Sequence, residues 1–200
     1  MRSIGQVVIV MVLGIAFAAA QEKSGNFAWK APEVGAGAFT DALGMLDRER
    51  EEYATNLATY AVNLIARERA SAASLDEARR YLALSLHLAP RNRRAIVANF
   101  QLSKGMVPEA VESDYSPEVL ARLLFTRAQM LKQQGGGEDQ LLARVFIELS
   151  AALDPRNEDA VYAAEVQRLD HGRVNWSDFT DVKREPREAA HEDGDSGSRP

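Results

Sequence analysis

The sequence predicts an all-α fold built from antiparallel helix hairpins. Three observations predict it: long stretches carry apolar residues at three- and four-residue steps, proline and glycine separate these stretches, and one helix–turn–helix pattern occurs twice. An apolar content of 46% supports a packed core, and 200 residues suffice for one domain. We expect roughly five to seven helices with disordered ends.

Residues 1–20 have the features of an export signal. A basic residue and an apolar run from Val7 to Ala20 precede the polar residues that begin at Gln21. This order is typical of a secretory signal that is cut before Gln21. An uncleaved signal-anchor, formed by residues 4–20, is the alternative, and only then would the protein contact the membrane. Both interpretations place the main body outside the cytoplasm, in the periplasm or the medium.

The following chain divides into a linker, residues 21–39, and a helical domain, residues 40–172. The linker contains Gly, Pro and Ala without periodicity. A first helix is expected to begin near Thr40, because no proline interrupts the periodic stretch that follows. Ser74 is expected to cap a second helix, which Pro90 ends.

Internal repetition is the most informative feature of the helical domain. Residues 78–98 and 143–163 lie 65 positions apart and share ten of 21 residues. Each segment contains an amphipathic helix, a Pro-Arg-Asn turn and the start of another helix. Chance rarely produces such a match, so we interpret the two segments as a repeat.

The repeated residues resemble the tetratricopeptide family, whose unit is a helix–turn–helix of about 34 residues. In the second helix of its unit, that family places a small, a large apolar and another small residue before a proline. The matching residues are Ala78, Leu82, Ser85 and Pro90, and again Ala143, Ile147, Ser150 and Pro155. The resemblance covers roughly residues 53–172. It departs at Arg127, where an apolar residue is usual, and after Gly105, where no second helix is expected.

The resemblance implies that the first helix of each unit lines a concave groove. Eight residues at matching positions are expected to face this groove: Arg94, Gln101, Lys104, Arg122, Phe125, Gln129, Lys132 and Tyr162. Their cationic, amide and aromatic groups suit an extended peptide or a partner helix. The alternative is that these residues form ordinary surface.

The C-terminal residues are expected to lie outside the repeats. Residues 173–182 contain Trp176 and Phe179, and they form either a cap over the last exposed helix or a docking segment. Residues 183–200 are charged and rich in Gly, Ser and Pro, which predicts a disordered tail. Trp29, in the linker, is either packed or an exposed anchor.

The sequence offers no catalytic, metal or cofactor site. Cysteine is absent, and His87, His171 and His191 are expected at surface, helix-end and tail positions. Without the signal segment, 23 basic and 29 acidic residues give a charge of −6, which argues against nucleic-acid binding.

We therefore expect an exported, non-catalytic scaffold or adaptor that binds a protein or peptide partner. Two alternatives remain open from the sequence. One is an accessory protein that binds a small ligand or glycan for an envelope enzyme system. The other is a self-assembling structural protein, because about three helical pairs are near the lower limit for a stable array.

Overall fold

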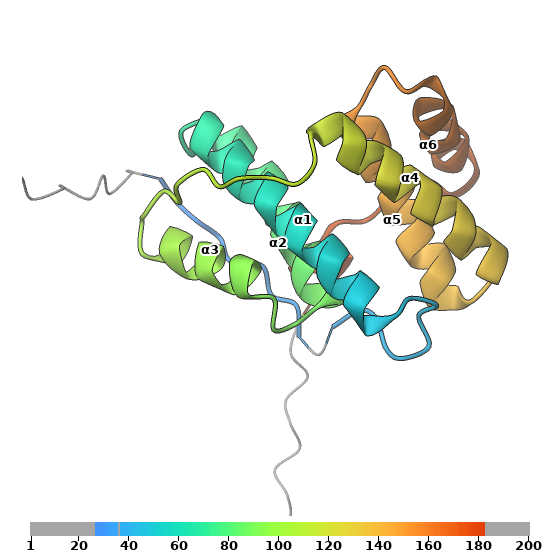
Figure 1. The fold of residues 1–200 in the computed structure, drawn as a ribbon, viewed down its shortest axis with the longest axis horizontal. Helices are drawn as coiled ribbons and strands as arrows, with labels where there is room; N and C mark the ends of the chain where they lie inside the picture. Colours follow the sequence, from blue (N-terminus) through green and yellow to red (C-terminus); the bar gives the residue numbers. More distant parts are fainter. Residues whose placement is uncertain (1–26, 36, 183–200) are drawn as a thin grey trace, which may run out of the picture.

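The computed structural model of the protein describes residues 27–35 and 37–182. The predicted signal segment (1–20) and the predicted tail (183–200) lie outside the described residues. An all-α fold with antiparallel helix pairs is confirmed (Figure 1). The described ranges contain seven helices: α1 (Asp47–Arg67), α2 (Ala72–Leu88), α3 (Arg93–Ser103), α4 (Pro117–Gln134), α5 (Gly137–Leu153), α6 (Glu158–His171) and α7 (Ser177–Thr180).

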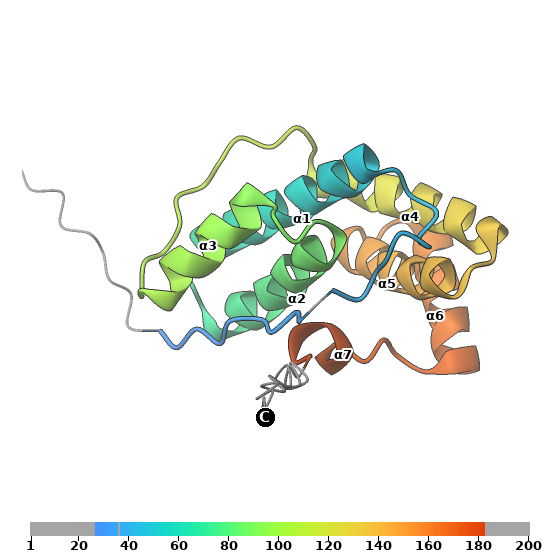
Figure 2. The ribbon, with the colours of Figure 1, turned by 90° about the horizontal axis from the view of Figure 1, so that it is seen from below.

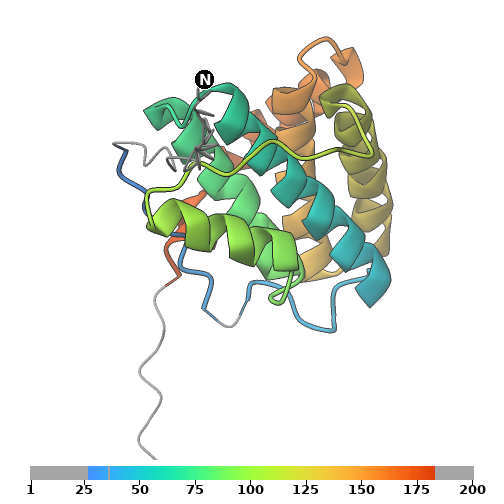
Figure 3. The same ribbon diagram turned by 60° about the vertical axis from the view of Figure 1, so that its left-hand side comes forward.

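Two helix hairpins form the centre of the molecule. α1 pairs with α2, and α4 pairs with α5, while α3 packs on the first hairpin and α6 on α5 (Figures 1 and 3). The two hairpins meet through aromatic side chains: the rings of Tyr53 on α1 and Phe146 on α5 lie 5.3 Å apart. None of the helices in the described ranges is long and apolar enough to cross a membrane.

The two similar sequence segments share the same helix-capping interaction. After each Pro-Arg-Asn turn the asparagine is the N-cap of the next helix. The side-chain oxygen of Asn92 accepts a hydrogen bond from the Ala95 amide at 3.1 Å, and Asn157 accepts one from the Ala160 amide at 3.1 Å. An asparagine cap satisfies a backbone donor that the first turn of a helix leaves free.

The same two segments also share a buried serine contact. Ser85 donates to the Ala54 carbonyl at 2.7 Å, and Ser150 donates to the Ala121 carbonyl at 2.8 Å. The donors are 65 positions apart and the acceptors 67, because the α1–α2 connection is two residues longer than the α4–α5 connection. A small side chain lets the paired helices approach closely, and the buried hydroxyl of each serine has a hydrogen-bond acceptor on the partner helix.

Two of the predicted helix starts are wrong. α1 begins at Asp47 rather than near Thr40, and the cap of α2 is Ser71 rather than Ser74. Thr40 does not cap a helix, because its hydroxyl and its amide both donate to the Glu138 carboxylate. This long-range contact draws the chain before α1 into turns, which local periodicity does not predict.

Arg127 occupies its unusual position for a structural reason. The side chain is 6% exposed, and its Nη2 donates to the Gly44 carbonyl at 2.6 Å and to Glu49 at 3.0 Å. Gly44 also donates through its amide to Asp139 at 2.7 Å. An apolar residue at position 127 would leave the Gly44 carbonyl and the Glu49 carboxylate without this donor. Arg127 therefore ties the segment before α1 to the α4–α5 hairpin.

An N-terminal strap (residues 27–35 and 37–46) lies along α2, where the sequence predicts a linker over most of its length (Figure 2). The strap meets the closing segment (residues 173–182) in a short parallel pairing. The Glu33 amide donates to the Thr180 carbonyl at 2.8 Å, and the Val182 amide donates to the Glu33 carbonyl at 2.9 Å. The short helix of the closing segment, α7, packs on α2.

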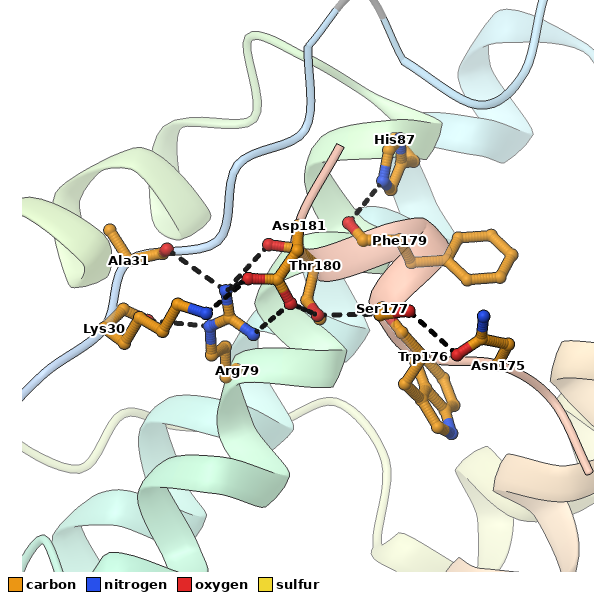
Figure 4. A network of polar contacts seen from close by, with 10 residues as sticks. All are labelled: Lys30, Ala31, Arg79, His87, Asn175, Trp176, Ser177, Phe179, Thr180 and Asp181. Atoms are coloured by element: carbon orange, nitrogen blue, oxygen red, sulfur yellow. Dashed lines mark hydrogen bonds and ion pairs between the residues drawn. The ribbon is translucent and has the colours of Figure 1, made fainter. Parts of the chain in front are cut away.

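Arg79, on α2, holds both end segments (Figure 4). Its guanidinium donates to the Lys30 carbonyl on the strap at 2.8 Å and to the Thr180 carbonyl on the closing segment at 2.7 Å. Its ion pair with Asp181 spans 3.0 Å. The hydrogen bonds from Arg79 and then Lys30 hold the pKa of Asp181 well below its ordinary value.

His87, also on α2, joins the same two segments (Figure 4). The ring is fully buried: Nδ1 accepts from the Ala38 amide at 2.8 Å, and Nε2 lies 2.7 Å from the Phe179 carbonyl. Because Nδ1 is an acceptor and Nε2 faces a carbonyl, the ring is neutral with its proton on Nε2. Burial lowers the pKa of His87 below its ordinary value. The surface position predicted for His87 is wrong.

Both tryptophans are packed rather than free. Trp29 donates through its indole N–H to Asn99 on α3 at 2.8 Å, and Trp176 donates to Glu148 on α5 at 2.9 Å. The guanidinium of Arg80 lies 5.8 Å from the centre of the Trp176 ring. The strap thus connects α3 to α2, and the closing segment connects α5 to α2.

Candidate binding groove

A groove runs between α1 and α3, and the helix-free segment 106–111 forms its third side. This segment leaves α3 and crosses α1 towards α4 (Figures 1 and 3). The volume of the groove is about 970 Å³, near the upper end of the usual range for ligand pockets. The hollow is partly open to solvent, so it can admit a chain segment.

The lining of the groove combines apolar and polar side chains. The apolar lining residues are Val62, Val97, Ala98, Met106, Val107, Pro108 and Val111. The polar lining residues are Glu51, Thr55, Asn92, Arg93, Arg94, Gln101 and Glu109. Such a lining gives binding energy from apolar contact and orientation from a few charged and amide groups.

Asn92 fixes one end of the groove. While its oxygen caps α3, its amide nitrogen donates to Glu51 and to the Thr55 hydroxyl on α1, both at 2.8 Å. The side chain is 2% exposed. Every polar atom of this buried amide has a partner, so the N-terminus of α3 is held at a defined distance from α1.

Asn63 fixes the other end of the groove. Its amide nitrogen donates to the Val111 carbonyl at 3.0 Å, and its oxygen accepts from the Val111 amide at 2.8 Å. The side chain thus pairs with the backbone of one residue from both sides, as a neighbouring strand would. This contact holds the helix-free segment against α1.

Two cations and two carboxylates lie around the groove. Arg93 and Arg94 come from α3, while Glu51 comes from α1 and Glu109 from the helix-free segment. Arg94 also donates to the Thr59 hydroxyl of α1, which orients its guanidinium across the groove. Opposite charges on facing walls favour an extended ligand that itself carries both signs.

The eight residues predicted to face one groove lie in several places. Arg94 and Gln101 line the α1–α3 groove. Lys104 follows α3, with its ammonium 5.6 Å from the centre of the Phe100 ring. Arg122 lines a separate hollow of about 240 Å³ between α1 and α4. The other four lie on α4, where Phe125 and Gln129 are half-buried and Lys132 is exposed, and on α6, where Tyr162 is 73% exposed.

The reason for this separation is the position of α4. A regular array would stack α4 on α3, but here α4 pairs with α5 and lies beyond α1 (Figure 1). The chain between Ser103 and Pro117 forms no helix, so it crosses α1 rather than packing as a second helix beside α3. The three helices that carry the predicted residues therefore face different directions.

Several residues that shape the groove have little local signal in the sequence. Asn92 belongs to the repeated turn, so its capping role could be predicted, but not its bonds to α1. Asn63 stands within a helix, 48 positions before its partner Val111, and no motif marks it. Met106 and Val107 lie in a stretch whose two prolines exclude a long helix but do not say where it runs.

The tyrosines with raised pKa values lie outside the groove lining. Burial, with nearby carboxylates, raises the pKa of Tyr53 and of Tyr60 to about 12, and burial raises the pKa of Tyr81 well above its ordinary value. Within the described ranges, no group of three or more His, Asp and Glu side chains is placed to hold a metal ion.

No protein-family model matches the chain, and searches of curated proteins and of solved structures likewise return no match. The function is therefore inferred from the geometry and the chemistry of the groove itself.

Proposed function

We propose that the chain is an exported, non-catalytic interaction module that binds a peptide segment or a partner helix in the α1–α3 groove. The observation that carries the proposal is the groove itself, with its apolar lining residues and its charges of both signs. Asn92 and Asn63 hold its walls before any partner arrives, which lowers the entropy cost of binding. A relation to tetratricopeptide repeats is part of this proposal and rests on the repeated sequence.

Export is supported by the N-terminal sequence alone, through the apolar run from Val7 to Ala20. A module that works outside the cytoplasm without disulfides needs packing contacts to hold the ends of its chain on the fold. The strap and the closing segment provide such contacts by joining both ends of the described chain on α2.

A small-ligand or glycan-binding role is the competing proposal. An enclosed pocket lined by ionisable groups with shifted pKa values would favour it. Tyr53 and Tyr60, whose pKa values are raised, instead line two small hollows of about 240 and 200 Å³. The size and the openness of the α1–α3 groove favour a peptide.

Affinity capture from the native envelope tests the proposal. The bait carries the double substitution Arg94→Glu and Val97→Asp in the groove, and the matched control carries Arg122→Glu in the hollow between α1 and α4. We expect one reproducible partner protein with wild type and with the control, and at least a tenfold loss with the groove variant. Equal capture by all three baits would contradict the proposal, and a bait that retains Met1 would contradict signal cleavage.

A further inference from the structure

α6 packs with its small residues inward and its large apolar residues outward. Ala160 is buried against α5, and Gln167, 5% exposed, donates to the Arg144 carbonyl at 3.0 Å. The large apolar side chains of the helix face solvent: Tyr162 is 73% exposed, Val166 36% and Leu169 74%. These three positions form one stripe, since they follow each other by four and three residues. An exposed apolar stripe of this kind marks an interaction surface.

α3 also carries large apolar residues on its exposed side. Ala95, Ala98 and Leu102 are buried against the first hairpin. Ile96, 46% exposed, and Phe100, 59% exposed, face solvent on the side that does not line the groove. The molecule therefore carries a second exposed apolar ridge, at its other end (Figures 1 and 2).

The two ridges carry opposite charges. The sequence of α6 contains four acidic residues, Glu158, Asp159, Glu165 and Asp170, against one arginine, Arg168. The sequence of α3 contains two arginines and no acidic residue, and a lysine follows it directly. Acidic residues are absent from the sequence over the whole interval between Glu77 and Glu109.

These charges decide between the candidate occupants of the α6 stripe. Pairing α6 with α6 of another copy would bring two acidic helices together, and pairing α3 with α3 would bring two basic helices together. Like charges at an interface cost binding energy, while opposite charges steer the encounter. The acidic surround of α6 also disfavours an anionic lipid surface. The complement that the molecule itself provides is the basic α3 ridge.

We propose that α6 of one copy docks on the α3 ridge of a second copy. Tyr162 and Leu169 supply the apolar contact on one side, and Ile96 and Phe100 supply it on the other. Because the two ridges lie at opposite ends of the molecule, the contact cannot close within one chain. A head-to-tail contact leaves one free α3 and one free α6 on every pair, so it builds open chains or closed rings. None of these four apolar residues lines the peptide groove, whereas the two arginines of α3, Arg93 and Arg94, do.

Analytical ultracentrifugation of the full chain tests the proposal with two complementary variants. Phe100→Asp removes the α3 ridge, and Leu169→Asp removes the α6 stripe. We expect wild type to gain mass with concentration and to lose this behaviour in high salt, because the contact pairs opposite charges. Each variant alone should be monomeric over the same range, with association weakened at least tenfold. An equimolar mixture should form a dimer and stop there, since it retains one intact α3 and one intact α6.

Leu141→Asp is the matched control, because Leu141 is a 37% exposed apolar residue on α5 outside both ridges. It should assemble as wild type does. Circular dichroism of each variant establishes that loss of assembly is not loss of folding. A Phe100→Asp protein that still dimerises alone would show that α6 pairs with itself. A Leu169→Asp protein that dimerises alone would show the same for α3, and a monomeric wild type would refute assembly altogether.

Discussion

His87→Ala should loosen both end segments from α2 at once. The substitution removes the acceptor of the Ala38 amide and the donor that faces the Phe179 carbonyl. It also leaves a hole at a fully buried site. Ala152→His is the matched control, because Ala152 occupies the corresponding position of the second segment and is exposed.

The size of the effect follows from the two hydrogen bonds. A buried polar group that loses its partner costs about 1–3 kcal/mol, and two such groups with a truncated ring cost about 3–5 kcal/mol in all. The stability of a domain is typically about 5–15 kcal/mol, so the variant should remain folded but with a much lower urea midpoint. Ala152→His should change the free energy of unfolding by less than about 0.5 kcal/mol.

The lowered pKa of His87 also predicts that the free energy of unfolding depends on pH. Because burial lowers the pKa of His87, the unfolded chain takes up a proton more readily than the folded one. The contribution of the neutral ring is complete above the ordinary histidine pKa of 6.5 and is lost as the pH falls from there through the folded pKa. As the pH falls, the free energy of unfolding of wild type should therefore decrease more steeply than that of His87→Ala. The difference in free energy of unfolding between the two proteins should become smaller at low pH.

Urea unfolding followed by tryptophan fluorescence measures these effects where they occur. Trp29 lies on the strap and Trp176 on the closing segment, so both emitters report on the segments that His87 holds. A His87→Ala protein within 0.5 kcal/mol of wild type at pH 8, or one whose pH dependence matches wild type, would refute the assigned role of His87.

Four further substitutions probe the other contacts. Ser85→Ala and Ser150→Ala should each lower the free energy of unfolding by about 1 kcal/mol, because each removes one buried hydrogen bond. Free energies of unfolding, measured with urea, that differ between the two variants by more than this amount would show that the two serines have unequal roles. Arg127→Leu should cost about 1–3 kcal/mol by the same assay, because Glu49 is partly exposed and water replaces some of the lost interaction; a neutral result would contradict the contact between the hairpins. Asn63→Leu should speed hydrogen exchange at the Val111 amide about tenfold, and an unchanged rate would mean that the groove wall is held by other contacts.

The repeated segments account for most of what the sequence predicts correctly. The spacing from Ala78 to Pro90 indicates a helix and its end, and the structure ends α2 at Leu88. Both signals are local, since they depend on side chains within one or two helical turns of each other. Within these segments, the small residues at Ser85 and Ser150 mark the positions where paired helices approach.

The closure of the fold could not be predicted, because its contacts join distant parts of the chain. His87 lies 49 positions from Ala38 and 92 from Phe179. In the second segment Ala152 replaces it, so the repeat itself gives no indication of a buried histidine. Arg127 departs from the tetratricopeptide pattern, but its partner at Gly44 lies 83 positions away.

The structure places only two of the predicted groove residues in the α1–α3 groove. Expecting a concave surface along the first helix of each unit identifies Arg94 and Gln101, which line the groove. It does not identify the segment from Met106 to Val111, because an irregular chain has no periodicity that fixes its path. The remaining predicted residues lie on α4, on α6 and directly after α3, because the chain crosses α1 after α3.

The most direct test of the proposed binding role is site-specific photo-crosslinking in the native envelope. A photoreactive phenylalanine analogue replaces Val97 in the groove, and in a second protein it replaces Gln133, an exposed residue on α4 away from the groove. We predict a crosslink from position 97 to one partner protein, carried by a single short segment of that partner, and no such product from position 133. Crosslinks of equal yield from both positions, or from position 133 alone, would contradict the account.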